Sequence, residues 1–373
     1  MSPGGFQRAP ARRVVIKKQE GCHVMLKKIT LALDLAGCPN RCRHCWLGWG
    51  PNGGLSREDL AWAAEAFRPF AQELAVYDWY REPDYSEDYR ELWELCESLS
   101  TPGSGREHFE LASLWRLARD ESYAAWLKGL GVNAVQVTLF GGEAATDRFT
   151  GRRGAYGDIL KAIEALLAQG IAPRIQVFVN KRNLDGLGAV EALMEELRLE
   201  ERCREAGREF SCFVHQGSCD GKNADFYADW VTPGDLEKIP PRLAAGTLRH
   251  FGAKSLREVF GRTEAELAAQ LREDRSTYCL SQEGPVFYID PSWDVYPNFT
   301  TPGSGWRLGN LKRDGAARVL EAYQKDESPG QRARKAVPVC QLAQAYADPE
   351  SQRLFGKDDY IIYLLNRYLE GET

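Results

Sequence analysis

The sequence lacks several features that mark other classes of protein. It has no run of about 18 apolar residues, so no membrane-spanning helix and no membrane partner are expected. Residues 1–24 contain no apolar core like that of a secretory signal and are expected to form a short basic arm. There is no basic excess either, because 48 Lys and Arg face 53 Asp and Glu, for a net charge of −5. We therefore expect no nucleic-acid partner.

Cysteine is too sparse for a disulfide scaffold. Ten cysteines are spread over 373 residues, whereas secreted disulfide-rich domains are short and dense in cysteine. A reducing cytoplasm is the expected compartment, and there clustered cysteines usually bind metal or carry out redox chemistry. The length allows a large core in one or two domains.

Three cysteines do cluster. Cys38, Cys42 and Cys45 lie in GCPNRCRHCW (residues 37–46) with the spacing C-x3-C-x2-C, and no fourth cysteine stands close by. Three thiolates on a [4Fe–4S] cluster leave one iron open to a small molecule. The alternatives are a non-catalytic zinc site, closed by Cys22 or His23, and a conventional electron-transfer iron–sulfur site.

Strand and helix patterns alternate around this motif. Residues 28–35, 132–140, 174–179 and 210–214 read as strands, and residues 56–70, 158–169 and 187–204 read as helices, the first capped by Ser56. This order predicts an α/β fold with a parallel sheet and crossover helices, whose chemistry lies at the C-terminal ends of the strands. Residues 71–121, rich in Trp, Tyr and acids, are expected to hold helices and loops inserted after the first helix.

The cysteine motif, placed directly after the first strand, resembles that of the radical S-adenosylmethionine (radical SAM) superfamily. CPNRCRHCW is most similar to the SPASM/twitch branch, whose members modify peptides and proteins. The resemblance implies a partial (β/α) TIM-like barrel, one [4Fe–4S] cluster on the three cysteines, and S-adenosylmethionine on the open iron. It also implies reductive cleavage to a 5′-deoxyadenosyl radical, which abstracts hydrogen from substrate. A barrel needs further strands, which we expect between residues 215 and 275, with TLRHF (247–251) as a candidate.

Other residues match positions that bind S-adenosylmethionine in that family. Gly141, Gly142 and Glu143 form GGE at the end of the second predicted strand, where glycines permit positive φ and a carboxylate suits an ammonium. His44 matches a ring that packs near the adenine, or it fills that space sterically. Asn180, at the end of the third predicted strand, is a further candidate, as are Lys181 and Arg182, or it only forms a turn.

The C-terminal part resembles a twitch extension. YIDPSWDVYP (288–297) predicts a β-hairpin with a turn at residues 290–293. Cys279 matches an auxiliary-cluster ligand, but Asn298 stands where the family has another cysteine. We therefore expect an extension without a complete auxiliary cluster. The alternative is a second cluster that recruits Cys212, Cys219 and Cys340. The predicted organisation is an arm (1–24), a barrel (25–250) and an extension (251–373).

The sequence does not identify the substrate. A peptide or a small molecule is expected, together with an external electron donor such as flavodoxin or ferredoxin. Residues 71–121 either form a substrate-selecting surface or a solvated helical pair with its tryptophans packed inward. Cys212 and Cys219 either donate hydrogen or are structural, and the oligomeric state stays open.

Overall fold

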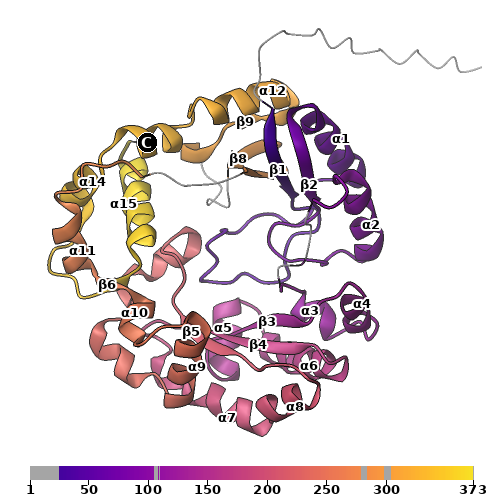
Figure 1. Cartoon of the computed structure of the whole chain (residues 1–373), viewed down its shortest axis with the longest axis vertical. Coiled ribbons are helices and arrows are strands. Elements are labelled where there is room, and N and C mark those ends of the chain that lie inside the picture. The colour runs from indigo at the N-terminus through magenta and orange to yellow at the C-terminus, as the bar shows by residue number, and fades with distance from the viewer. Residues whose placement is uncertain (1–24, 105–107, 109, 279–283, 298–303, 373) are drawn as a thin grey trace, which may run out of the picture.

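A computed structural model describes residues 25–104, 108, 110–278, 284–297 and 304–372. Figure 1 shows helices arranged around the outside of two sheets that face each other across the middle of the molecule. No helix among the described residues combines the length and apolarity that a bilayer crossing requires.

The N-terminal half of the chain contains five strands with their connecting helices. Its elements are β1 (Leu26–Leu33), α1 (Arg57–Phe67), η1 (Arg68–Phe70), β2 (Ala71–Tyr77), α2 (Tyr89–Leu99), α3 (Leu114–Leu117), α4 (Tyr123–Gly129), β3 (Ala134–Leu139), α5 (Glu143–Thr150), α6 (Ala155–Ala168), β4 (Ala172–Phe178), η2 (Leu184–Gly186), α7 (Gly188–Glu196), α8 (Leu199–Glu205) and β5 (Cys212–His215).

The C-terminal half is mainly helical and contains one hairpin. Its elements are η3 (Gly221–Asp229), η4 (Pro233–Lys238), α9 (Pro241–Phe251), α10 (Leu256–Phe260), β6 (Arg262–Thr263), α11 (Glu264–Leu271), β7 (Val286–Ile289), β8 (Asp294–Pro297), η5 (Ser304–Trp306), β9 (Gly309–Asn310), α12 (Leu311–Gln324), α13 (Pro329–Ala336), α14 (Val339–Tyr346), β10 (Leu354–Phe355) and α15 (Lys357–Glu372).

The parallel strands lie in two separate sheets. One sheet has the order β2-β1-β7-β8-β9, in which β1 is parallel to both β2 and β7. The other has the order β3-β4-β5 and is parallel throughout. Together they form a split, partial TIM-like barrel with most helices outside, and the predicted α/β fold is confirmed (Figure 1).

The edges that face the split are occupied by the chain that joins the two sheets. On β2, the N–H groups of Leu74 and Val76 donate to the hydroxyls of Thr101 and Ser100, each at 3.0 Å. On β3, the Gln136 N–H donates to the carbonyl of Glu110 at 2.8 Å. These bonds satisfy edge groups that a continuous barrel would pair strand to strand.

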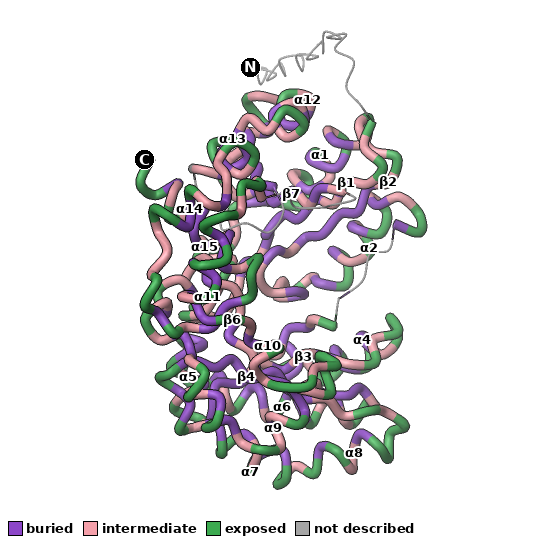
Figure 2. Tube along the Cα trace, turned by 60° about the vertical axis from the view of Figure 1, so that its left-hand side comes forward, coloured by how far each residue is buried: buried purple, intermediate pink, exposed green. Residues whose placement is uncertain are grey.

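Three apolar cores hold this arrangement together. One packs β3, β4 and β5 against α6 and α7, and one packs β1, β2 and β7 against α1, α2 and α12. The third is rich in aromatic rings and includes residues of α11, α14 and α15. Figure 2 shows the strands as largely buried and the outer helices as buried on one face only, as expected for amphipathic helices.

Several predicted elements are confirmed, including the Ser56 capping box of α1 and the β7–β8 hairpin. In the hairpin turn Trp293 has a φ of 70°, a conformation that glycine adopts more readily. The predicted helix 187–204 is two helices, because Arg198 is left-handed with a φ of 49°.

Two sequence-based expectations about strands are wrong. Residues 71–77 are strand β2 rather than part of a helical insertion, and TLRHF lies within helix α9. Residues 215–275 supply only the two-residue β6 among regular strands, which pairs with β10. The sixth parallel strand is β7, so one sheet takes strands from both sides of the predicted boundary near residue 250. The boundaries themselves stay predictions.

Candidate functional site

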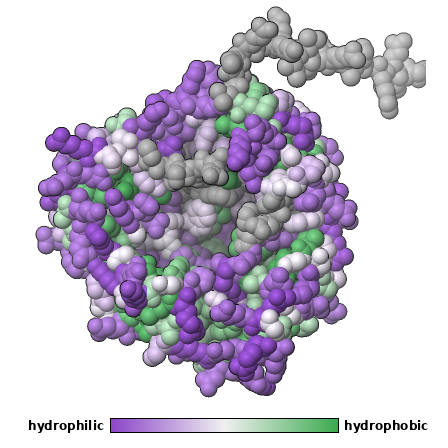
Figure 3. Space-filling view, viewed as in Figure 1, coloured by the Kyte–Doolittle hydropathy of each residue, from purple (hydrophilic) through white to green (hydrophobic). Residues whose placement is uncertain are grey.

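A cavity of about 1000 Å³ lies between the two sheets. Figure 3 shows the middle of this face of the molecule as a hollow. Alternate residues of the strands point into it, among them Thr30 and Ala32 of β1, Tyr77 of β2 and Gln136 and Thr138 of β3. The loop that follows β1 closes one side. We call residues 37–52 the cysteine loop.

Cys38, Cys42 and Cys45 all line this cavity and are half-buried. Burial raises the pKa of each thiol, and neighbouring Glu82 raises that of Cys38 further. Three ionised thiolates are therefore stable here only beside a positive metal centre, which fits an iron–sulfur cluster. Within the described part of the chain, no three His, Cys, Asp or Glu side chains gather as they would around a single metal ion. A cubane instead binds each thiolate on a different iron atom.

One side of the cysteine loop is held by a polar network based on Arg81. Its guanidinium forms a buried ion pair with Asp34 at the end of β1 and donates to the carbonyls of Gly50 and Pro51 at 2.9 and 2.7 Å. Asn52 accepts from the Cys38 N–H and donates to the Cys38 carbonyl, each at 3.0 Å. The first cysteine is thus fixed through its backbone.

The other side of the loop is held by two glycines that allow close backbone approach. Gly151 has a φ of 68°, and a Cβ there would lie 2.4 Å from the Arg41 carbonyl oxygen. Gly221 has a φ of 52°, and a Cβ there would lie 2.3 Å from the Trp46 carbonyl oxygen. The Lys222 N–H donates to the Cys45 carbonyl at 2.9 Å. The α5–α6 turn and the loop after β5 therefore hold the cysteine loop between them.

His44 packs between two strand-end rings. Its ring centroid lies 4.6 Å from that of Phe140 and 4.2 Å from that of Phe178. Burial lowers its pKa to about 3, so the imidazole is neutral. The Nδ1 atom of His44 is buried without a hydrogen-bond partner among the described residues. This atom is therefore available to form a hydrogen bond with a ligand. A contact with adenine stays a prediction.

GGE lies at the tip of β3, as predicted. Gly141 has the expected positive φ, at 130°, and Gly142 is the N-cap of α5. Glu143 is the first residue of α5 and its side chain is exposed. Phe140, directly before them, lines the cavity. The geometry places GGE at the same end of the barrel as the cysteine loop, and its contact with a ligand stays a prediction.

Asn180 is buried at the end of β4 and already serves a turn. Its side-chain oxygen accepts from the Arg182 N–H at 2.9 Å, and its own N–H donates to Asn183 at 2.8 Å. Arg182 pairs with Asp229 at 2.7 Å. The turn-forming alternative thus has direct support, and binding by Asn180 stays a prediction.

Glu82 is a site residue that sequence reasoning missed. It lines the cavity, accepts from the Ser113 hydroxyl at 2.7 Å, and lies 3.9 Å from the Cys38 sulfur. Burial raises its pKa to about 7. Asp34 and Arg81 were also missed. The signal for Asp34 was a lone carboxylate inside the apolar run LALDLAG, which requires a partner.

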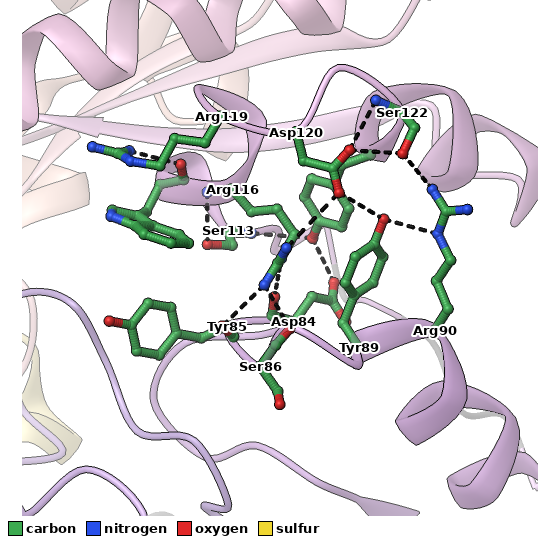
Figure 4. Close-up of polar contacts among 12 residues, drawn as sticks. Asp84, Tyr85, Ser86, Tyr89, Arg90, Ser113, Arg116, Arg119, Asp120 and Ser122 are labelled. Carbon is green, nitrogen blue, oxygen red and sulfur yellow. Dashed lines mark hydrogen bonds and ion pairs between the residues drawn. The ribbon is translucent and has the colours of Figure 1, made fainter.

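The chain between β2 and β3 forms a wall of the cavity. Trp79, Pro83 and Trp115 line it, whereas Trp93 packs inward against buried His108, with centroids 4.5 Å apart. Figure 4 shows how Arg116 fixes the turn behind this wall. The guanidinium donates to the carbonyls of Asp84, Tyr85 and Ser86 at 2.6, 3.0 and 2.5 Å. The inward packing of Trp93 supports the packed alternative, and selection of the substrate by this segment stays a prediction.

Among the described residues, none of the other cysteines lines the cavity. Cys212 and Cys219 are buried, and Cys340 is half-buried on α14. Cys22, His23, Cys279 and Asn298 lie outside the described residues.

Comparison with known proteins places this geometry in a family. Residues 34–183, from the end of β1 through GGE and Asn180, match the model of the Radical SAM superfamily. This segment is a radical SAM domain. Members of this superfamily use a [4Fe–4S] cluster and S-adenosylmethionine.

Individual relatives are similar over different shares of the chain. The Fe-coproporphyrin III synthase of Methanosarcina barkeri is 30% identical over 84 residues, which are 22% of this chain and 21% of that protein. The match thus spans about a fifth of the curated relative's length. A structure of anSMEcpe with bound AdoMet has a TM-score of 0.48 at 15% identity and covers 92% of this chain and 98% of its own. Streptococcus suis SuiB bound to precursor peptide SuiA has a TM-score of 0.44 at 11% identity, over 82% of this chain and 66% of its own.

Proposed function

We propose that the chain is a radical SAM enzyme that abstracts hydrogen from a peptide or a small molecule. The observation that carries the proposal is the placement of three cysteine thiols of one loop in the wall of a cavity of about 1000 Å³ inside a radical SAM domain. The cavity is large enough for a cofactor and a substrate side by side.

Cys38, Cys42 and Cys45 would hold one [4Fe–4S] cluster and leave one iron for S-adenosylmethionine. When bound, this pair supplies one-electron cleavage of the S–C5′ bond and a 5′-deoxyadenosyl radical. The protein itself positions the cysteine loop and shields the cavity from water. Asn52 and Arg81 fix the cysteine loop, and the rings of His44, Phe140 and Phe178 form an apolar wall that excludes water.

His44, Gly141, Gly142, Glu143 and Asn180 are proposed to contact S-adenosylmethionine. In support, Glu143 is an exposed carboxylate at the tip of β3, and the buried Nδ1 of His44 has no partner among the described residues. Because Asn180 already accepts from its own turn, it has one remaining group, the side-chain amide, to offer a ligand.

The β2–β3 chain is proposed to select the substrate. Trp79, Trp115 and Glu82 line the cavity, and aromatic faces beside a carboxylate suit a cationic or amphipathic group. The β7–β8 hairpin is proposed to belong to a twitch-like extension (251–373) that lacks a complete auxiliary cluster. An external donor such as flavodoxin or ferredoxin would supply the electron, in the cytoplasm.

Anaerobic reconstitution tests the proposal. The protein is loaded with iron and sulfide, the iron is counted, and dithionite and S-adenosylmethionine are added. We expect about four irons per chain and slow formation of 5′-deoxyadenosine, measured by mass spectrometry. Cys42→Ala should abolish both.

Two results would change the assignment. A colourless zinc protein that leaves S-adenosylmethionine intact would support the non-catalytic alternative. About eight irons per chain would support a second cluster, as in SPASM-type peptide-modifying enzymes.

A further inference from the structure

The outer side of the cysteine loop differs in charge from the rest of this acidic chain. Residues 37–50 contain Arg41 and Arg43 and no acid, and residues 148–154 contain Arg148, Arg152 and Arg153 and no acid, although the whole chain has a net charge of −5. Backbone hydrogen bonds join the two segments, from the N–H of Arg41 to the carbonyl of Thr150 at 3.0 Å and from that of Arg43 to Phe149 at 2.8 Å. Five arginines thus meet beside two of the cysteines.

Most of these cations are not neutralised by the protein. Arg152 pairs with Asp158 at 2.6 Å and faces the cavity. Arg41, Arg43, Arg148 and Arg153 are exposed, and none forms an ion pair within the described residues. Since natural surfaces usually intersperse opposite charges, such a group indicates an acidic partner.

Aromatic side chains complete this surface. Trp49 is 51% exposed, and its indole N–H donates to the Cys42 carbonyl at 2.9 Å. The Lys222 ammonium lies 5.0 Å from the centre of the Trp49 ring and 3.8 Å from the Asp225 carboxylate. Exposed tryptophan and arginine are the residues most enriched where proteins bind each other.

The cations of this surface, apart from Arg152, lie outside the lining of the cavity, and Trp49 borders both the surface and the cavity. Cys42, His44 and Cys45 line the cavity, whereas Arg41 and Arg43, which alternate with them along the chain, do not. Only the thickness of one loop therefore separates the cysteines from the surface formed by Arg41, Arg43, Trp49, Arg148, Arg153 and Lys222. We call these six residues the cationic face.

We propose that the cationic face is the docking site of an acidic one-electron donor of the flavodoxin or ferredoxin class. The inference rests on the proposed function, which consumes one electron for each S-adenosylmethionine cleaved. One electron leaves the donor, for example a flavodoxin hydroquinone that becomes a semiquinone, and enters the cluster. Weak, charge-steered encounters over small areas are typical of redox partners.

Charge reversal with a matched control tests the docking site. The test variant carries Arg43→Glu, Arg148→Glu and Arg153→Glu. The control carries Arg204→Glu, Lys254→Glu and Arg272→Glu, which are exposed cations elsewhere, so both variants have the same net charge. A milder variant with glutamine at positions 43, 148 and 153 guards against loss of the loop. Photoreduced flavodoxin is the probe, and its oxidation is followed by stopped-flow absorbance.

The expected result separates docking from chemistry. Reduction by flavodoxin should slow at least about tenfold in the test variant and about twofold or less in the control, and the wild-type rate should fall with salt. Binding of oxidised flavodoxin, measured by titration, should weaken in parallel. Iron content and dithionite-driven cleavage of S-adenosylmethionine should stay unchanged, because dithionite needs no docking surface.

Three results would overturn the proposal. One is reduction of the test variant by flavodoxin as fast as reduction of the control. Another is a test variant that loses iron and dithionite-driven cleavage to the same extent as flavodoxin-driven reduction, which would make the arginines structural. Binding of a 20-nucleotide oligomer, but not of flavodoxin, would make the surface a polyanion site. If wild-type protein with dithionite leaves S-adenosylmethionine intact, the proposed function fails. The flavodoxin titration then still tests the docking site by itself.

Discussion

The two sheets of this barrel are built in different ways. The β3-β4-β5 sheet takes consecutive strands joined by crossover helices, so its contacts are near in sequence. The β2-β1-β7-β8-β9 sheet joins β1 to β7, and Thr30 pairs with Val286 across most of the chain. The β2-β1-β7-β8-β9 sheet, which we call the long-range sheet, carries the cysteine loop. The β3-β4-β5 sheet, which we call the local sheet, carries GGE. The cavity exists because the sheets face each other without merging.

The difference shows where the site's rigidity comes from. On the long-range sheet a buried ion pair, Asp34 with Arg81, fixes the loop, and their side chains are 2% and 8% exposed. On the local sheet the turn after α5 fixes it by close backbone contact at Gly151. An ion pair fixes one side of the cysteine loop and close backbone packing fixes the other. Separate substitutions can therefore remove each contact without the other.

The largest effect is expected from replacing the three clustered cysteines, which line the cavity between the two sheets. Cys38→Ala, Cys42→Ala or Cys45→Ala should reduce the iron content from about four per chain to below about one. Cleavage of S-adenosylmethionine should be lost with it. Cys340→Ala, on α14, is the control and should keep the full count. If Cys340→Ala loses iron instead, the C-terminal extension holds a cluster.

Breaking the ion pair of the long-range sheet comes next. Arg81→Met should lower the free energy of unfolding of the apoprotein by about 3–5 kcal/mol, because it leaves the Asp34 carboxylate buried and unpaired. The measurement is guanidinium unfolding. Asp34→Asn combined with Arg81→Met should recover part of the loss.

A surface ion pair between helices α6 and α8, which belong to the β3-β4-β5 half of the barrel, is the matched comparison. Arg202 and Glu164 pair at 2.8 Å with side chains 31% and 51% exposed, and Arg202→Met should cost no more than about 1 kcal/mol. Equal losses for Arg81→Met and Arg202→Met would contradict the role given to the buried pair.

The close backbone packing between the α5–α6 turn and the cysteine loop is tested by comparing two glycines of that turn. Gly151 and Gly154 both have positive φ, at 68° and 80°, but only at Gly151 does an added Cβ meet the cysteine loop. Gly154→Ala should cost about 1–2 kcal/mol of unfolding free energy from backbone strain alone. Gly151→Ala should cost more and should also weaken retention of iron. Identical iron contents in the two variants would show that the turn does not position the loop.

The last prediction concerns pH, at the junction of β5 with α15. Burial raises the pKa of Asp359 from 3.8 to about 6, with further contributions from Asp358 and Asp220. Between these pH values the folded chain holds a proton that the unfolded chain has lost. The free energy of unfolding should therefore fall as pH rises from about 4 to 6, by less than about 1.4 kcal/mol per pKa unit.

Asp359→Asn should flatten that part of the stability–pH curve, measured by thermal unfolding of the apoprotein at each pH. Asp225→Asn, an exposed acid, is the control. An unchanged slope in Asp359→Asn would assign the pH dependence to other groups.

Sequence reasoning succeeded where signals are local. The β3-β4-β5 sheet follows from runs such as VNAVQVTLF, and the cysteine and GGE motifs lie where their spacing placed them. It failed for β2, because Gln72 and Glu73 make the first half of AQELAVY polar and the strand leads into an acidic, aromatic segment. TLRHF is the last part of helix α9, which begins with proline at Pro241, and Gly246 lets this helix pack closely on Cys212.

Partners distant in sequence could not be predicted. Asp34 needs Arg81, Cys38 needs Asn52, and β1 needs β7, and no periodicity of the chain encodes such pairs. The split between the sheets is equally hidden, since it depends on Ser100, Thr101 and Glu110 occupying the strand edges.

The most direct test of the central claim is to ask what binds the fourth iron. The reconstituted, reduced protein is mixed with S-adenosylmethionine labelled with ¹⁷O in its carboxylate and examined by electron–nuclear double resonance. The account predicts a coupling between the cluster and the label, which disappears when unlabelled cofactor replaces it. A cluster of four irons that shows no such coupling, and whose spectrum does not change when the cofactor is added, would mean that a protein side chain holds the fourth iron.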